Sequence, residues 1–244
     1  MQTTKWGPPG WKFLHSIISE YPNDPTIDEK NIYKCFISHI ANILPCIYCR
    51  ISYRNFVNEL SIVSWLKNKR RLTYYFYLIH NKVNDKLRQQ GYLNDKNPSF
   101  SQIEQKYKRS KVYTDCGWDF IYAITYNYPI NPSDCDKYNH KIFFTKLKYV
   151  MPYLPVKQLY QKYFCQYPVN NYLHNRQTLT LWFYNIHKRI IENLIHEGFL
   201  ENNYYTLSYF ETTTKYENFR ASCQTNSFQT SNSCRLPSNN SISV

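Results

Sequence analysis

Residues 72–80 read Leu-Thr-Tyr-Tyr-Phe-Tyr-Leu-Ile-His, and residues 179–187 read Leu-Thr-Leu-Trp-Phe-Tyr-Asn-Ile-His. The two stretches lie 107 residues apart, and the same offset pairs Trp11 with Trp118. In this alignment, which needs no gap, about a quarter of residues 11–93 are identical to their counterparts. A register held through several separate segments indicates an internal duplication, so the chain contains two copies of one unit.

The duplication divides the chain into three predicted parts. Single domains commonly contain roughly 100–150 residues, so 244 residues suit two small domains. We expect the first copy over residues 1–112 and the second over residues 113–217. Residues 218–244 are rich in Ser, Asn and Thr, and we expect them to form a flexible tail that carries Cys223 and Cys234.

The composition favours helices. Only 5 of the 244 residues are Gly, whereas hairpins and barrels use Gly at positive φ. We therefore predict an all-α fold, in which a four-helix bundle is followed by a second, degenerate helical copy. Apolar spacing, Pro and Gly place the helices of the first copy at residues 11–19, 28–43, 46–58 and 72–90, with a shorter one at 100–109.

The net charge of +13 and the absence of long apolar runs limit the function classes. A basic chain attracts polyanions without sequence preference, and we expect the basic residues 67–71 to form a solvated loop, so no specific nucleic-acid partner is predicted. No run reaches the roughly 18–20 apolar residues that cross a bilayer, and the N-terminus lacks the apolar core of a signal peptide. We expect a soluble chain with no membrane partner that is not secreted by a signal peptide.

Eight cysteines without a signal peptide point to metal binding or redox chemistry rather than to a framework of structural disulfides. Cys46 and Cys49 form the only Cys-x-x-Cys pair. A zinc site would need a second close pair of ligands, so no metal site is predicted. Four cysteines stand alone in the sequence and are expected to be buried or spare thiols: Cys35, Cys116, Cys135 and Cys165.

Residues that differ between the copies are candidates for function, because both copies must fill a core. Five polar or reactive residues of the first copy are replaced in the second: Cys46 by Tyr153, Cys49 by Val156, His15 by Tyr122, Asn81 by Lys188 and Asn84 by Ile191. The comparison places the site in the first copy and indicates that the second has lost it.

Pro45 is expected to begin a helix directly before the cysteine pair. A helix N-terminus favours a thiolate, and two neighbouring sulfurs allow a mixed disulfide to resolve within the protein. Structural zinc, thioredoxin-like exchange and plain buried cysteines remain alternatives for Cys46 and Cys49, although a thioredoxin fold would need strands around them. His80 and Asn84 share a helix face that could contact an adenine edge, but His187 occupies the same place in the second copy, so a core role also suits His80.

At these residues the chain resembles the Erv/ALR family of FAD-linked sulfhydryl oxidases, particularly the forms encoded by large cytoplasmic DNA viruses. The likeness covers residues 6–90 and continues weakly to Tyr107. It implies a helical bundle that holds FAD. Four features carry it: Trp6-Gly7 ahead of Trp11-Lys12-Phe13-Leu14-His15, the ending Tyr21-Pro22, Pro45-Cys46-Ile47-Tyr48-Cys49, and His80-Asn81-Lys82-Val83-Asn84.

The resemblance also implies an activity and roles for residues. Electrons would pass from dithiols through Cys46 and Cys49 to FAD and then to oxygen, forming disulfides in protein substrates and hydrogen peroxide. Cys49 would lie next to the flavin, and Cys46 would exchange with incoming thiols. Cys223 and Cys234 would be a possible shuttle. The implied cofactor-binding residues are Trp6, Gly7, Trp11, His15, His80, Asn81, Val83, Asn84, Lys86 and Tyr107.

The chain also departs from the family pattern. Arg88-Gln89 stands where the family usually has Gly-Lys, and Pro8 stands where many members have Arg, so the phosphate contacts are open. The sequence leaves open a homodimer through the first copy or an internal pseudo-dimer, in which the degenerate copy packs in place of a second subunit. A viral member would act in the host cytoplasm at virus assembly sites or in the virion. A partner-binding scaffold and a basic nucleic-acid binder remain alternatives without redox turnover.

Overall fold

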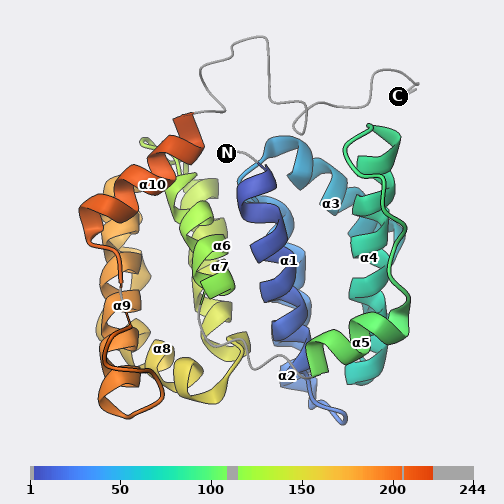
Figure 1. Cartoon of the computed structure of the whole chain (residues 1–244), viewed down its shortest axis with the longest axis horizontal. Coiled ribbons are helices and arrows are strands. Elements are labelled where there is room, and N and C mark those ends of the chain that lie inside the picture. Colours follow the sequence, from blue (N-terminus) through green and yellow to red (C-terminus); the bar gives the residue numbers. More distant parts are fainter. Residues whose placement is uncertain (1–2, 109–114, 205, 222–244) are drawn as a thin grey trace.

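The computed structural model describes residues 3–108, 115–204 and 206–221. Within these ranges the protein has ten α-helices, two short 3-10 helices and no β-strand, which confirms the predicted all-α class (Figure 1). The first copy holds α1 (Thr3–Ser19), α2 (Ile27–Ile43), α3 (Ile47–Glu59), η1 (Ile62–Trp65), α4 (Lys69–Gln89) and α5 (Phe100–Lys108). The second holds α6 (Asp115–Tyr126), α7 (Asp134–Val150), α8 (Leu154–Gln166), η2 (Val169–Tyr172), α9 (Arg176–His196) and α10 (Tyr209–Ala221).

Helix α1 begins earlier than predicted. It starts at Thr3 and runs through Gly7-Pro8-Pro9-Gly10, whereas the sequence pattern predicted a start at Trp11, and that prediction was wrong. Compared with alanine, glycine costs about 1 kcal/mol and proline about 3 kcal/mol in a helix interior. Tertiary contacts must therefore stabilise the first turns of α1.

Helix α4 also begins before its predicted first residue. The side chain of Asn68 accepts a hydrogen bond from the Arg71 backbone N–H at 2.9 Å and caps the helix, which begins at Lys69. Most of the basic cluster 67–71 is thus the first turn of a helix, and the expected loop was wrong. The helix ends before Gly91, whose φ of 76° lies in the left-handed region that favours glycine, as expected.

Local hydrogen bonds repeat between the copies. The Tyr21 hydroxyl donates to the Leu66 carbonyl at 2.8 Å, and the Tyr128 hydroxyl donates to the Leu173 carbonyl at 3.0 Å. Both tyrosines are fully buried, so each bond satisfies a polar group within a core. The second copy therefore keeps the packing of the first, in agreement with a duplicated helical unit.

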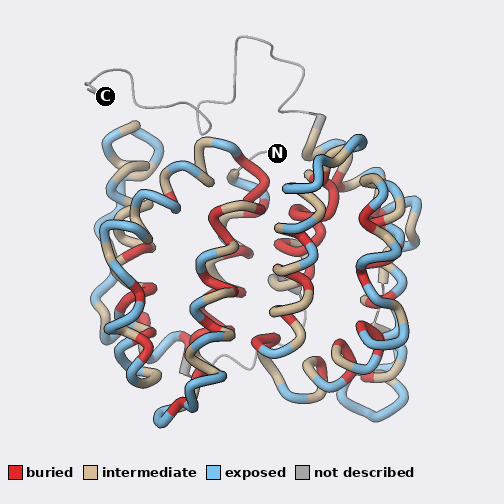
Figure 2. The backbone as a smooth tube through the Cα atoms, turned by 180° about the vertical axis from the view of Figure 1, so that it is seen from behind, coloured by how far each residue is buried: buried red, intermediate tan, exposed pale blue. Residues whose placement is uncertain are grey.

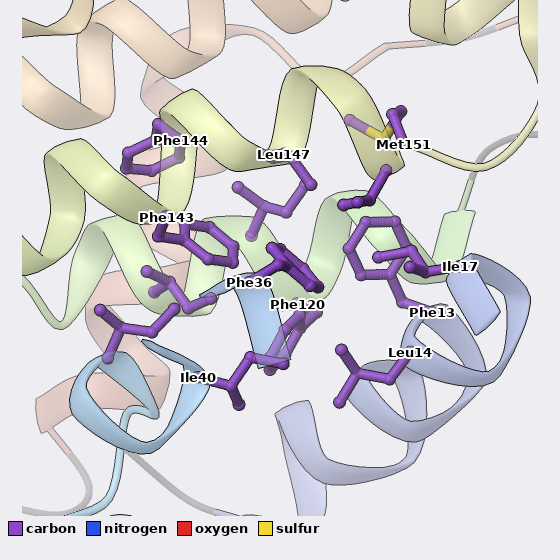
Figure 3. Packing of buried hydrophobic residues seen from close by; sticks show 14 of the residues in the cluster. Phe13, Leu14, Ile17, Phe36, Ile40, Phe120, Phe143, Phe144, Leu147 and Met151 are labelled. Carbon is purple, nitrogen blue, oxygen red and sulfur yellow. The ribbon is translucent and has the colours of Figure 1, made fainter. Parts of the chain in front are cut away.

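The two copies pack side by side, α1 against α6 and α2 against α7, and the buried side of each bundle faces inward (Figures 1 and 2). Figure 3 shows side chains of both copies in one continuous core. The rings of Phe36 and Phe143, which correspond to each other in the duplication, stack with centroids 5.6 Å apart. This is the arrangement expected of an internal pseudo-dimer.

A reciprocal contact joins α1 and α6. A Cβ atom on Gly10 would lie 2.8 Å from the ring of Phe120, and a Cβ atom on Gly117 would lie 2.6 Å from the ring of Phe13. Gly10 and Gly117 correspond to each other in the repeat, as do Phe13 and Phe120. Each copy thus inserts a phenyl ring where the other copy lacks a side chain, which gives the interface a pseudo-two-fold symmetry.

The predicted boundary between residues 112 and 113 lies outside the described residues. Helix α10 continues to Ala221, past the predicted end of the second copy at residue 217. Cys223 and Cys234 also lie outside the described residues. Among the helices that the structure describes, none is long and apolar enough to cross a membrane.

Candidate cofactor cavity and redox pair

The two cysteines lie at the start of α3. Cys46 is its N-cap residue, directly after Pro45, and the backbone N–H of Cys49 donates to the Cys46 Sγ atom at 3.4 Å. Cys46 is buried, with 5% of its surface exposed, and Cys49 is half-buried. The helix N-terminus therefore stabilises negative charge on the Cys46 sulfur, as a thiol exchange site requires.

A half-buried cation, Arg50, interacts electrostatically with both cysteines. The Arg50 side chain donates from Nε to the Leu44 carbonyl at 2.6 Å, which holds the guanidinium against the chain just before Pro45 and Cys46. Burial lowers the pKa of Arg50, while the charges of Asp136, Cys46 and Cys49 act in the opposite direction. Arg50 therefore supplies positive charge near the redox pair, and the charge of Asp136 in the second copy acts on the same guanidinium.

A cavity of about 900 Å³ begins at Cys49 and extends between α1, α3, α4 and α5. Its size falls in the range of roughly 300–1,000 Å³ that is common for cofactor sites. Four lysines line it, Lys5, Lys12, Lys86 and Lys106, and they suit an anionic group such as a pyrophosphate. Besides Cys49, the predicted cofactor residues that line it are Trp6, Gly7, Trp11, His80, Val83, Asn84, Lys86 and Tyr107.

Aromatic rings form a layer at the side of this cavity. Trp11 stacks on His80 with centroids 4.0 Å apart and planes 10° apart, and His15 stacks on Tyr107 at 4.5 Å. The two histidines share a hydrogen bond of 3.0 Å between His15 Nε2 and His80 Nδ1. Such a bond needs one nitrogen that donates and one that accepts. The layer presents flat faces to a planar ligand.

Three predicted site residues do not line this cavity, and one of them, His15, faces a different cavity. The other two, Cys46 and Asn81, are also absent from the wall of the cavity of about 900 Å³. His15 lines a polar cavity of about 690 Å³ on the other side of the aromatic layer, together with Ser19, Lys69 and Glu104. The structure therefore brings together most, but not all, of the predicted cofactor residues.

One buried donor in the cavity wall, the Trp6 indole N–H, fits a bound cofactor, and a buried His15 nitrogen faces the neighbouring cavity. The Nε1 atom of Trp6 and the Nδ1 atom of His15 are buried and have no hydrogen-bond partner. A buried polar group without a partner costs about 1–3 kcal/mol. Gly7 lies in the cavity wall, and a Cβ atom there would meet open space. Trp6 and Gly7, with the lysines and the stacked rings, fit a large ligand that has planar rings and phosphates.

Some cavity residues were missed by sequence reasoning. Lys86 donates from Nζ to the Ser52 hydroxyl at 2.6 Å, so Ser52 orients the lysine that was predicted to contact phosphates. Asp119 and Phe120 reach the cavity from the second copy. The comparison between copies selected residues that differ, and it could not select Phe120, because Phe13 is its identical counterpart.

At the corresponding place, the described part of the second copy holds a smaller cavity. It holds about 220 Å³ and keeps the ring pair Trp118 and His187, with centroids 4.3 Å apart. Tyr216 on α10 stacks on Tyr122 at 5.0 Å, and both rings line this cavity. Tyr153, which stands in the place of Cys46, has a φ of 70°, a conformation that residues other than glycine rarely adopt. The second copy therefore lacks both the redox pair and the room for a large cofactor.

Burial of the histidines makes stability depend on pH. Burial lowers the pKa of His15 to about 3, and those of His80 and His140 to about 4, from 6.5. The unfolded chain therefore takes up protons first as the pH falls. We expect the free energy of unfolding to keep its full histidine contribution above about pH 6.5. Between about pH 6.5 and pH 4 it should fall by up to about 1.4 kcal/mol per pH unit for each histidine.

Urea unfolding between about pH 7.5 and pH 5 measures this loss. The variant His140→Gln, which lies outside the cavity, should show a smaller slope than the wild type. An unfolding midpoint that does not change with pH would contradict the expectation.

A sequence model of the Erv1/Alr family matches residues 9–108 and again residues 115–210. The chain belongs to the Erv1/Alr family. Each copy is matched by the same family model, so the second is a degenerate member of this family within the same chain. Among described residues, no group of three or more His, Cys, Asp or Glu side chains is arranged to hold a metal ion.

The first copy is similar to individual sulfhydryl oxidases. A probable FAD-linked sulfhydryl oxidase of Acanthamoeba polyphaga mimivirus is 34% identical over 85 residues, which cover 34% of this chain and 59% of the relative. The mitochondrial FAD-linked sulfhydryl oxidase ERV1 of Saccharomyces cerevisiae is 32% identical over 82 residues, 34% of this chain and 42% of the relative. The match thus spans about half the length of these relatives. The Erv1/Alr family consists of FAD-linked sulfhydryl oxidases, and the roles of single residues stay predictions.

Proposed function

We propose that this protein is an FAD-dependent thiol oxidase that forms disulfide bonds in protein substrates. The observation that carries the proposal is that Cys49 opens into the same cavity as eight predicted cofactor residues. Family membership supports FAD as the cofactor. The mimivirus relative supports a viral setting, which would place the enzyme in the host cytoplasm or the virion.

The two cysteines divide the work: Cys46, although only 5% of its surface is exposed, exchanges with substrate thiols, and Cys49 opens into the cavity. A substrate thiolate attacks Cys46 of the oxidised pair, and the Cys46–Cys49 bond breaks, which leaves the electron pair on the Cys49 sulfur. A second substrate thiol then displaces Cys46, so the substrate becomes a disulfide and the pair a dithiol. Arg50 stabilises the thiolate during both steps.

FAD, when bound, would supply the two-electron chemistry that takes electrons from the dithiol to oxygen and yields hydrogen peroxide. The cavity residues would hold and orient it. Trp11 and His80 offer a stacked face, Lys86 offers a positive charge, and the Trp6 Nε1 atom offers a hydrogen-bond donor. We also propose Cys223 and Cys234 as a shuttle that carries electrons from substrates to Cys46, as the resemblance implies.

Purified protein tests the proposal directly. We expect a yellow protein with the visible absorption of bound flavin, which consumes oxygen when dithiothreitol is added and releases one peroxide for each dithiol oxidised. Heat-released cofactor should be FAD by chromatography. A colourless protein that gains no flavin on incubation with FAD, and that uses no oxygen, would refute the proposal and would leave the scaffold and nucleic-acid alternatives.

A further inference from the structure

The first three turns of α1 form one wall of the cofactor cavity, yet their sequence is poorly suited to a helix. Lys5, Trp6 and Trp11 line the cavity from this segment. Between them lie Gly7-Pro8-Pro9-Gly10, and glycine and proline are the two poorest helix formers. Proline also lacks the backbone N–H that would bond to the preceding turn. This wall therefore depends on contacts from outside the helix.

The second copy supplies those contacts. The ring of Phe120 lies against Gly10, where a Cβ atom would be only 2.8 Å away. The same ring packs on Trp6 with centroids 6.1 Å apart. At the start of the helix, the Lys5 ammonium lies 5.4 Å from the ring centre of Phe219 on α10. Three residues along the wall are thus held by two aromatic rings of the degenerate copy.

Phe120 and its neighbour Asp119 also form part of the cavity surface. Phe120 is completely buried, so its ring backs the cavity wall, whereas the half-buried Asp119 supplies accessible surface. The Asp119 carboxylate accepts a hydrogen bond from Lys215 at 2.9 Å and another from the Tyr216 hydroxyl, both on α10. These partners compensate its negative charge, so the carboxylate does not oppose an anionic cofactor. The second copy therefore contributes surface as well as support.

We propose that the degenerate copy completes the cofactor site of the first: Phe120 closes the cavity and holds the Gly7–Gly10 wall of α1, so that cofactor retention requires the second copy. This inference rests on the proposed function. Phe120 is a cavity residue and a positioning residue for Trp6, and it takes no part in the chemistry of the cysteines. The lost redox motif of the second copy is compatible with this role, because the role uses only core side chains.

The duplication provides a matched control for this proposal. Phe13 makes the symmetry-related contact, with its ring against Gly117 of the second copy. Phe13 is also buried, at 4% exposure, but it does not line the cofactor cavity. Replacing Phe13 or Phe120 removes the same ring from the same type of contact. Only the second replacement opens the cofactor cavity.

The experiment compares Phe120→Ala with Phe13→Ala in the full chain. We measure flavin content after gel filtration, the dissociation constant of FAD by flavin fluorescence, and thermal unfolding of the cofactor-free forms. Both variants should lose thermal stability to a similar extent. Phe120→Ala should bind FAD at least about tenfold more weakly, whereas Phe13→Ala should stay within about twofold of the wild type. Phe120→Leu, which keeps an apolar side chain, should restore part of the affinity.

Equal FAD affinity in the two alanine variants would overturn the inference, because the second copy would then act on stability alone. Should either alanine variant fail to fold, the milder pair Phe120→Leu and Phe13→Leu carries the same comparison with the same expected order. A wild-type protein that binds no FAD would refute the proposed function instead, so the two failures are distinct.

Discussion

Replacing Cys49 with serine should abolish thiol oxidation while the protein stays yellow. Serine fits the place of cysteine but forms no disulfide, so no electron pair can reach the cavity from a substrate. We expect the oxygen consumption with dithiothreitol to fall at least about a thousandfold, which corresponds to about 4 kcal/mol in the activation barrier. The flavin absorption should persist, since Cys49 occupies only one end of a cavity of about 900 Å³.

Two further variants sharpen this test. Cys46→Ser should lose turnover to the same extent, because the pair acts as a unit. Cys165→Ser is the control, since Cys165 is exposed on α8 and lies outside the cavity. Its activity should match that of the wild type. Oxygen consumption that survives in Cys49→Ser would show that the electrons reach oxygen by another route.

Replacing Phe143 with alanine should produce a large loss of stability. Phe143 is fully buried and stacks on Phe36 of the first copy, at the centre of the interface between the two bundles. Removal of such a ring costs about 3–5 kcal/mol of unfolding free energy, because it combines lost burial with a cavity. Urea unfolding of the cofactor-free protein, followed by circular dichroism, measures the loss.

The double variant Phe36→Ala with Phe143→Ala tests whether this stability comes from contact between the copies. Stacked aromatic pairs contribute about 0.5–1.5 kcal/mol beyond burial. The stability losses of the two single variants should therefore sum to more than the loss of the double variant. Phe210 offers the control, since 79% of its surface is exposed and its replacement should change stability by less than about 0.5 kcal/mol. A loss below about 1 kcal/mol in Phe143→Ala would mean that the copies pack differently.

Much of the fold could be predicted because the duplication keeps an unbroken register. The helices around Phe36 and His80 follow from apolar spacing, and capping residues fix most of their ends. The start of α1 could not be predicted in this way, because local propensity argues against a helix through Pro8 and Pro9. Contacts with the second copy, which are distant in sequence, override that propensity.

The candidate site was predictable where the copies differ and hidden where they agree. Cys49 and Asn84 were found because the second copy replaces them, and both line the cavity. Phe120 could not be found, because its counterpart Phe13 is the same residue. The two identical residues therefore differ in role, because Phe120 borders the large cavity and Phe13 does not.

The reciprocal insertion of two rings beside two glycines constrains how the gene can change. Gly10 and Gly117 each leave space for a ring that belongs to the opposite half of the chain. A larger residue at either glycine would require a smaller residue in place of the ring about a hundred residues away. The two halves therefore cannot diverge independently at this interface. Each half carries both a ring and a space, and the two contacts have the isologous pattern of a two-fold interface, here within one polypeptide.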